Sequence, residues 1–447
     1  MDDLRHEYLW LRHMVPKNVF DMITDMNPSR FATHSLQDAR VLRILSAALE
    51  AVDPAEAVRR HLPGLNGDVY GLGIGKASVP MLTALAERYP LSGALAISKH
   101  ASSPPSNLFP VLLGAHPIPD ARSIHAGERA LEFVSALNEE DTLVCLISGG
   151  GSALMTAPLI PLEDLQTLTS LLLSCGANIN EINTLRRHLD RIKGGGLVRA
   201  TKANVISLIL SDLIDNSLEA IASGPTAPDP TTRKDALAVL RKYKLEDRVR
   251  ISNLQSLISS RETLKPDDLI LSRVQNIIIG DNKFAAQAAL AQAKREGFES
   301  EILTSELQGE AREVGIALAG KLRDEISKRP PPFCLIAGGE TTVTLRGEGK
   351  GGRNQELALA AMDELRDMQN VMLIALATDG EDGPTDAAGA VATGESARRA
   401  ESLGVDAAGH LSRNDAYPFF DALGDLIKTG PTGTNVNDLI FLLGLGG

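Results

Sequence analysis

Two glycine-rich turns have the residue types needed to bind an anion. In residues 71–78 (GLGIGKAS), glycines let a backbone approach a phosphate closely, and Lys76 adds a cation where a helix would start. Residues 146–154 (LISGGGSAL) offer a row of backbone N–H groups. A tight strand-to-helix turn would also explain each motif taken alone. The candidate phosphate-binding residues of the two turns are Gly73, Gly75, Ser148, Gly149, Gly150, Gly151 and Ser152.

Acidic residues follow two further strand-like runs. Asp212 ends the run NVISLILSD, where a carboxylate could hold Mg²⁺, orient a hydroxyl or cap a helix. Residues 377–390 (ATDGEDGPTDAAGA) carry Asp379, Asp382 and Asp386, whose oxygen atoms suit Mg²⁺. The alternative for this second segment is a solvated acidic turn. Asp212 and Asp379 are our candidate metal ligands.

The densest mixture of charge and glycine spans residues 338–360 (GGETTVTLRGEGKGGRNQELALA). Glycine in a loop costs conformational entropy, so we expect ligand contacts to offset that cost here. Arg353 precedes the helical pattern NQELALA and is a candidate cation for a transferred group. Further candidate substrate-binding residues of this segment are Glu340, Thr341 and Asn354. Among the histidines, His116 in the turn GAHPIPD is the best placed for a role in a site.

Together these parts favour phosphoryl transfer, with cations supplied by the glycine-rich turns and metal ligands by the acidic residues at strand ends. A transferred phosphoryl group carries charge on three oxygens, so its catalysis consists mainly of positioning and of stabilisation by Lys, Arg and Mg²⁺. The first turn is not a Walker A loop, because Tyr70 and Ala77 stand where that motif needs Gly and Ser or Thr.

The elements that must position these turns are short apolar runs separated by helical patterns, with helices expected over 78–88 and 123–137. Runs that are apolar throughout indicate strands covered on both faces, and hence an open, mostly parallel, Rossmann-like α/β sheet. Residues 341–347 (TTVTLRG) predict a hairpin with the preceding run, which would make the C-terminal sheet mixed. The expected strands are 68–73, 94–98, 142–148, 204–212, 275–281, 333–339, 341–347 and 371–380.

Composition excludes several classes of protein. The chain has 447 residues, enough for two or three domains, and a net charge of −12 with 4% aromatic residues. This charge argues against a nucleic-acid or polybasic membrane-surface partner. No apolar run approaches the ~20 residues of a membrane span. The three distant cysteines and the acidic N-terminus, which is neither a signal nor a transit peptide, predict a cytoplasmic protein.

The motifs taken together resemble glycerate 2-kinase of the MOFRL family, from about Gln37 to the C-terminus. This resemblance implies ATP- and Mg²⁺-dependent phosphorylation of the 2-hydroxyl of D-glycerate, with Lys76 and Arg353 tied to activity. With Asp212 added from its place at a strand end, the candidate catalytic residues are Lys76, Arg353 and Asp212. It further implies a large Rossmann-like domain, a smaller C-terminal α/β domain and an active site in the cleft between them. The motifs are GLGIGKAS, GAHPIPD, LISGGGSAL, INTLRRHLDRIKGGGL, IASGPT, GGETTVTLRGEGKGGRNQELALA, TDGEDGPTDAAGA and GPTGTNVNDL.

The expected domains are an N-terminal extension over 1–32, a Rossmann-like domain over 33–265 and a MOFRL-type domain over 266–447. Small molecules, D-glycerate and ATP, are the expected partners, and a homo-oligomer stays open. The chain departs from the family pattern at four positions, which bear on the acceptor and the metal. These positions are Asp190, Gly196, Asp215 and Asn216.

Two rival functions remain. A nicotinamide-dependent hydroxypyruvate or 2-hydroxy-acid reductase would use the first turn as a dinucleotide site. Against it, the turn lacks the third glycine of that motif, and the next run ends in Ser98 and Lys99 rather than in a ribose-binding acid. A non-enzymatic sensor of a nucleotide or sugar acid would bind ligand without turnover.

Overall fold

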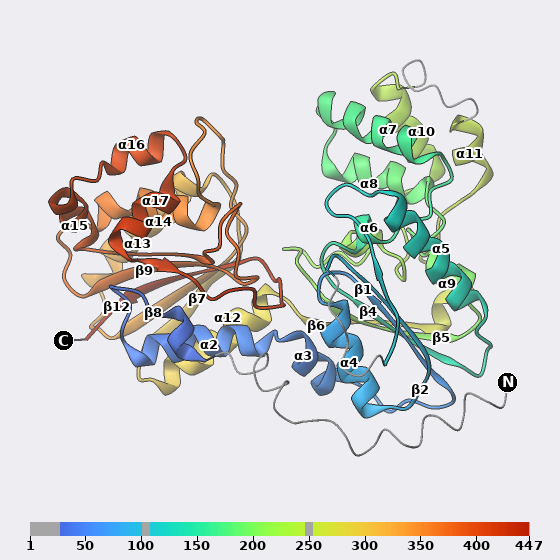
Figure 1. The fold of residues 1–447 in the computed structure, drawn as a ribbon, viewed down its shortest axis with the longest axis horizontal. Helices are drawn as coiled ribbons and strands as arrows, with labels where there is room; N and C mark the ends of the chain where they lie inside the picture. The colour runs from blue at the N-terminus through green and yellow to red at the C-terminus, as the bar shows by residue number, and fades with distance from the viewer. Residues whose placement is uncertain (1–26, 101–107, 246–253, 447) are drawn as a thin grey trace.

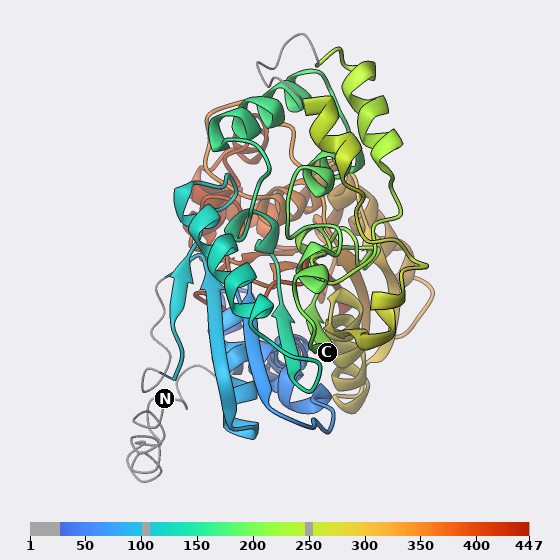
Figure 2. The same cartoon turned by 90° about the vertical axis from the view of Figure 1, so that its right-hand side faces the viewer.

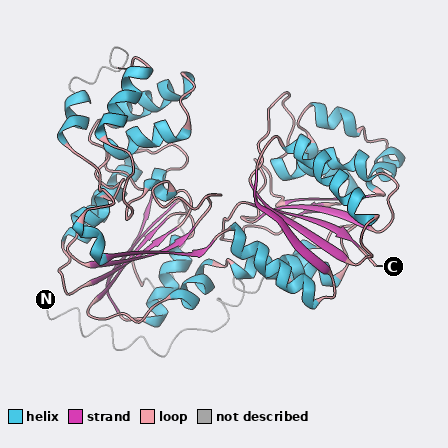
Figure 3. Ribbon diagram, turned by 180° about the vertical axis from the view of Figure 1, so that it is seen from behind, coloured by secondary structure: helices cyan, strands magenta, loops and turns pink. Residues whose placement is uncertain are grey.

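The computed structural model describes residues 27–100, 108–245 and 254–446. Two sheets, each with helices on both faces, form two lobes that lie side by side (Figures 1 and 3). We call the lobe around the N-terminal sheet the first lobe and the other the second lobe. Within the described residues, no helix combines the length and the hydropathy needed to cross a membrane.

The first sheet is wholly parallel, as predicted, with the strand order β3-β2-β1-β4-β5-β6. This order reverses direction between β1 and β4, and ligands of open α/β sheets bind at such a switch point, outside the carboxyl ends of the strands. The strands are β1 (Val69–Ile74), β2 (Leu91–Ser98), β3 (Val111–Leu113), β4 (Thr142–Ile147), β5 (Asn204–Leu210) and β6 (Val274–Gly280).

Helices cover both faces of this sheet, which explains why its strands are apolar throughout. The side chains of α3 (Pro54–His61) and α4 (Ser78–Arg88) join one core, and those of α5 (Ala121–Ser135) and α9 (Gly196–Ala200) join another. The structure confirms the predicted helices over 78–88 and, shifted by two residues, over 123–137. A group of helices with its own core, which we call the helical cap, lies above the sheet (Figures 1 and 2). It consists of α7 (Leu162–Ser174), α8 (Ile179–His188), α10 (Arg233–Lys242) and α11 (Leu254–Ser260).

The second sheet is mixed, as predicted, with the order β11-β10-β9-β12-β8-β7. Strands β7, β8 and β9 run in one direction, and β12 runs antiparallel between β8 and β9. The carboxyl ends of β8 and β9 therefore meet the start of β12 at one edge. The strands are β7 (Glu299–Leu307), β8 (Phe333–Gly339), β9 (Val371–Ala377), β10 (Gly389–Thr393), β11 (Leu426–Ile427) and β12 (Asp438–Gly444).

One face of the second sheet is covered by α13, α14, α15 and α17, and the other by α2 and α12. The core around α2 and α12 continues into the first lobe through Leu208, Leu210 and Ile279, so the lobes share apolar packing. The helices are α2 (Ala39–Ala51), α12 (Asn282–Arg295), α13 (Ala311–Ile326), α14 (Arg353–Leu365), α15 (Ser396–Leu403), α16 (Ala407–Ser412) and α17 (Ala416–Leu423).

The predicted hairpin over 341–347 is wrong. Strand β8 is bordered by β7 on one side and by β12 on the other, so it has no free edge for a further strand. Residues 341–347 form only an isolated bridge, between Thr342 and Glu310. The sheet is mixed because of β12 and β10, which the sequence analysis did not predict.

The predicted domain limits also change. Strand β6 pairs with β5, so the chain leaves the first sheet after Gly280 rather than at residue 265. Near the N-terminus, α2 packs on α12, and Thr33 Oγ1 donates to Asp425 Oδ1 at 3.0 Å. Residues 28–51 thus belong to the second lobe (α2 in Figure 1). Of the predicted extension over 1–32, residues 1–26 lie outside the described residues.

Candidate active site

The first two glycine-rich turns meet at the switch point of the first sheet. Gly75 has φ +117°, and a Cβ there would lie 2.3 Å from Ser148 Oγ, so only glycine fits. The amide of Lys76 donates to Gly149 O at 3.0 Å, and that of Ala77 to Ser148 Oγ at 3.0 Å. Ser148 thus holds the loop. The Lys76 side chain is exposed, and no acceptor among the described residues contacts it.

The glycine run after β4 lies against Asp212 and His116. A Cβ on Gly149 would be 2.3 Å from Asp212 Oδ2, and one on Gly150 would be 3.2 Å from the His116 ring. Burial raises the pKa of Asp212, and the charge of Lys76 opposes that shift. No helix begins at Asp212, so the helix-cap alternative for this residue is wrong.

Arg353 lies at the carboxyl edge of the second sheet, where it begins α14. Its Nε is 2.5 Å and its Nη2 3.1 Å from the two carboxylate oxygens of Asp438, and its Nη1 is 2.7 Å from Glu340 Oε1. Glu340 follows β8 and Asp438 begins β12, where it pairs in register with Gly339. The sequence analysis quoted the motif GPTGTNVNDL, which contains Asp438, but did not single out this residue. Its signal would have been a lone acid at the start of the apolar run LIFLLG.

The Asp382 side chain caps the N-terminus of α14. It accepts hydrogen bonds from the amides of Asn354 at 3.1 Å and Gln355 at 2.8 Å. Burial, with a further contribution from Asp438, raises the pKa of Asp382 to about 7. The Asn354 side chain is buried and donates to Asp382 at 3.3 Å. Asp382 and Asn354 therefore hold the start of the helix that presents Arg353.

The pKa of Asp379, which follows β9, is influenced by charges from both lobes. Burial raises its pKa, while the positive charges of Lys76 and Arg353 both act in the opposite direction. One carboxylate thus lies within the fields of both candidate cations, which come from different lobes. A pocket of about 430 Å³ is lined from both sides of the same boundary, by residues 212–215 of the first lobe and by Glu306, Gln308, Glu340 and Thr342 of the second.

The glycine-dense loop before Arg353 has a structural cause. A Cβ on Gly347 would lie 2.7 Å from Arg413 Cα, and one on Gly349 would lie 2.5 Å from Arg413 O. The glycines therefore allow the loop to lie against the turn at residues 413–415. The expected ligand contacts of this loop stay a prediction. Lys350 lies over the Tyr417 ring, 4.1 Å from its centroid.

The acidic residues do not form a preassembled metal centre. Within the described ranges, no group of three His, Cys, Asp or Glu side chains could hold a metal ion. Asp386 lies at the surface, where Tyr417 donates to it at 2.5 Å. One Asp379 oxygen accepts the Glu381 amide at 3.1 Å. Thr341 is buried next to Glu340.

The departures from the family pattern are built into the fold. Asp190 is buried and pairs with Lys193 at 2.8 Å. A Cβ on Gly196 would lie 2.1 Å from Arg191 O, so a larger residue would displace the backbone here. Asn216 has φ +53° and donates to Asp281 at 2.6 Å. Asp215 is exposed and accepts the Ser217 amide.

Comparison with known proteins gives two family matches. Residues 40–258 match a family described as a domain of unknown function, DUF4147, and residues 333–438 match the MOFRL family. A D-glycerate 2-kinase of Thermotoga maritima is 42% identical over 89% of this chain and 96% of its own length. A protein of Agrobacterium vitis, provisionally named a hydroxypyruvate reductase, is 38% identical over 90% of this chain and 93% of its own.

A solved structure agrees with these matches over the whole fold. The crystal structure of a glycerate kinase from Thermotoga maritima aligns with a TM-score of 0.85 and 42% identity, covering 90% of this chain and 98% of that one. Similarity of this extent includes both lobes. The chain therefore belongs to the MOFRL-type glycerate 2-kinase family.

Proposed function

We propose that this protein is a D-glycerate 2-kinase, which transfers the γ-phosphoryl group of ATP to the 2-hydroxyl of D-glycerate and releases ADP and 2-phosphoglycerate. The observation that carries the proposal is the similarity to glycerate kinases over both lobes, at 42% identity and a TM-score of 0.85. The charges of Lys76 and Arg353, which come from different lobes, both lower the pKa of one carboxyl, Asp379, against the effect of burial. Membership of the family supports the same reaction.

In this proposal, Lys76 and Arg353 stabilise the charge that spreads over the phosphoryl oxygens during transfer. Lys76 is available as it stands. Arg353 is engaged by Asp438 and Glu340, which orient its guanidinium, and its side chain is still 32% exposed. The backbone amides of residues 149–151 supply further donors for phosphate oxygens.

Asp212 is the proposed group that orients the acceptor hydroxyl and accepts its proton. It lies against the glycine run at the carboxyl end of β5, and burial raises its pKa, which makes it a better base than a solvated carboxylate. Both properties favour a proton acceptor beside the site where the phosphate would be held.

Mg²⁺ is proposed as the metal of the reaction. Mg²⁺ uses only one or two protein carboxylates and takes its remaining ligands from water and substrate phosphates, so the donor chemistry of Asp379 and Asp212 fits it. When bound, the ion would neutralise charge on the phosphates of ATP. Asp379 has one oxygen engaged by a backbone amide, which leaves the other for such a role.

A reductase is the second candidate, since the first sheet is a parallel sheet with a switch point, as in dinucleotide-binding folds, and one relative is named for that activity. Against it, β2 ends at Ser98 and is followed by Lys99, so no acid stands where a nicotinamide ribose would bind.

The two candidates give different products. Protein incubated with ATP, Mg²⁺ and D-glycerate should release ADP, and adding enolase alone should convert the product to phosphoenolpyruvate. Phosphoenolpyruvate that forms only when a phosphoglycerate mutase is also added would identify the 3-phosphate instead. NADH or NADPH oxidation with hydroxypyruvate, without ADP release, would favour the reductase.

A further inference from the structure

A second pocket, of about 690 Å³, lies between the switch point and the helical cap. Its wall contains Gly150, Ser152 and Asp212 from the carboxyl edge of the first sheet and Arg186 from α8 of the cap. This pocket therefore adjoins the proposed site of phosphoryl transfer but extends away from the second lobe. Its volume is within the range of small-molecule sites.

Lys193, a cation in the wall of this pocket, is already neutralised by Asp190. Lys193 Nζ lies 2.8 Å from Asp190 Oδ2 and 3.1 Å from Thr156 Oγ1, and both charged side chains are 4% exposed. Asp190 also accepts the Ile192 amide at 2.8 Å. This pair satisfies itself and leaves no net charge for a ligand.

Arg186 is different, because no acceptor among the described residues contacts its guanidinium. It is half-buried, and burial without a partner lowers its pKa. A guanidinium removed from water without an acceptor costs free energy, which a bound anion would recover.

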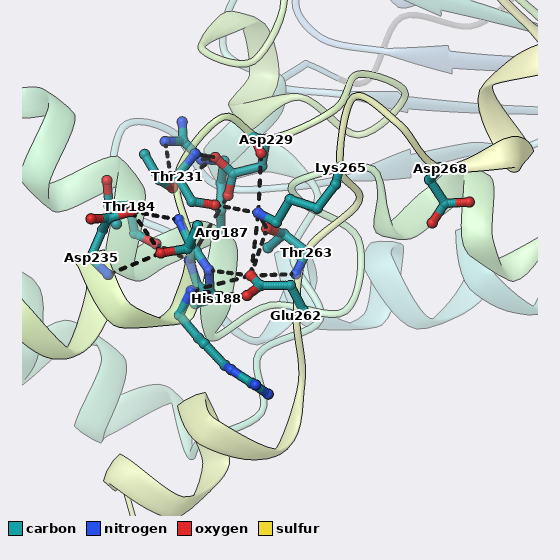
Figure 4. A network of polar contacts seen from close by, with 12 residues as sticks. Thr184, Arg187, His188, Asp229, Thr231, Asp235, Glu262, Thr263, Lys265 and Asp268 are labelled. Carbon is teal, nitrogen blue, oxygen red and sulfur yellow. Dashed lines mark hydrogen bonds and ion pairs between the residues drawn. The ribbon is translucent and has the colours of Figure 1, made fainter.

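The next two residues of α8 show that this is not a property of the helix. Arg187 Nε lies 3.0 Å from Asp229 Oδ1, and its Nη1 donates to Glu219 O at 3.2 Å. His188 Nε2 lies 3.2 Å from Glu262 Oε1, within the same polar network (Figure 4). Successive helix residues point about 100° apart, so Arg186 faces the pocket while its neighbours face this network.

We propose that Arg186 binds the carboxylate of the acceptor, and that the pocket beneath the helical cap is the acceptor site; this inference rests on the proposed kinase function. The planar guanidinium can donate two parallel hydrogen bonds to one carboxylate. Arg186 on the cap would hold the carboxylate end of the acceptor, with Asp212 and the glycine run beside its hydroxyl. Small 2-hydroxy acids are the substrate class that such an arrangement selects.

The test is a comparison of Arg186→Gln and Arg186→Lys with the wild-type enzyme. We expect Arg186→Gln to raise KM for D-glycerate by about 10- to 100-fold, the value of a charged hydrogen bond, with KM for ATP unchanged. The KM of Arg186→Lys for D-glycerate should lie between those of the wild type and Arg186→Gln. Arg241→Gln, which changes an exposed arginine of the cap, is the matched control. Because Arg186 has no partner to lose, thermal unfolding should show that both variants remain folded.

A second measurement isolates the recognised group. Titration calorimetry with D-glycerate alone should show binding to the wild type and weakened binding to Arg186→Gln. With glyceramide, whose amide carries no charge, wild type and variant should bind equally. An unchanged KM for D-glycerate in folded Arg186→Gln, or a rise in KM for ATP instead, would overturn the inference. Turnover by the wild type would still support the proposed kinase function in that case. Absence of glycerate phosphorylation by the wild type would remove the proposed function and this inference with it.

Discussion

The carboxyl edges of the two sheets hold their cations in opposite ways. Lys76 of the first lobe is exposed and contacts no acceptor among the described residues, and its loop is fixed only through its backbone. Arg353 of the second lobe is engaged by Asp438 and Glu340, within a group of carboxyls that also caps α14. The first cation is therefore free to follow a ligand, whereas the second is part of the structure that positions it.

This difference predicts that function and stability are separable in the first lobe but coupled in the second. A charge that nothing in the fold balances can be removed at little cost to folding. A charge that balances a buried carboxylate cannot be removed at little cost, because its removal leaves an uncompensated buried ion. Four substitutions test this contrast, taken from the largest expected effect to the smallest.

Arg353→Ala should reduce both the stability and the activity of the protein. Without the guanidinium, the buried Asp438 loses its partner, and we expect a loss of about 3–5 kcal/mol in the free energy of unfolding. Loss of one donor to the transferred group should also lower kcat by about 100-fold or more. Chemical denaturation and steady-state kinetics measure the two effects. Arg129→Ala, which breaks an exposed pair with Glu132, should cost no more than about 1 kcal/mol. Unchanged stability in Arg353→Ala would show that the pair with Asp438 is not needed for folding.

Asp382→Asn should change the pH dependence of stability. The pKa of Asp382 is raised to about 7 by burial, so the folded state binds a proton more tightly than the unfolded state does. Its contribution is fully present below about pH 4 and is lost as pH rises through about 7, a change of about 4 kcal/mol. Relative to Asp382→Asn, the wild type should become less stable over this window in denaturant unfolding. A difference that stays constant from pH 4 to pH 8 would mean that Asp382 remains ionised.

Lys76→Ala should lower kcat by about 100-fold while leaving the free energy of unfolding within about 0.5 kcal/mol of the wild type. The reason is that the side chain is exposed and unpaired in the described part of the chain. Steady-state kinetics and thermal unfolding of the same preparation give both values. Lys202→Ala, another exposed lysine of the first lobe, is the control for a non-specific effect of charge. Near-normal turnover in folded Lys76→Ala would refute the proposed role.

Gly149→Ala should displace Asp212, because the added Cβ would lie 2.3 Å from its Oδ2. We expect kcat to fall by about 10-fold or more, through misplacement of the group that orients the acceptor hydroxyl. Gly320→Ala, at a helical glycine with open space around it, is the matched control and should keep full activity. Equal activity in both variants would show that the position of Asp212 is not critical.

Strands buried on both faces could be predicted, because continuous apolar runs such as those of β4 and β9 are typical of strands that helices cover on both sides. Strand β7 is only partly buried and does not have this continuous apolar pattern. Strand β12 was not predicted, because its first residues belong to a motif that was interpreted as a glycine-rich turn. The predicted hairpin over 341–347 was wrong because a strand can be added only at a free edge, and both edges of β8 are already paired. The two glycine-rich turns of the first lobe could each be predicted from the sequence, but their contact could not. Asp438 was missed because its partner Arg353 lies 85 residues away.

The sequence by itself determined the local properties: which runs form strands, which turns expose backbone amides, and that Lys76 and Arg353 are basic side chains. Those properties depend on neighbours in the chain. Only the tertiary structure decided which cation is free, which carboxyls are buried together, and that Arg186 lines a pocket while Arg187 joins a polar network. These outcomes depend on burial and on distant partners, and neither desolvation nor charge pairing is fixed until the lobes and the helical cap have assembled.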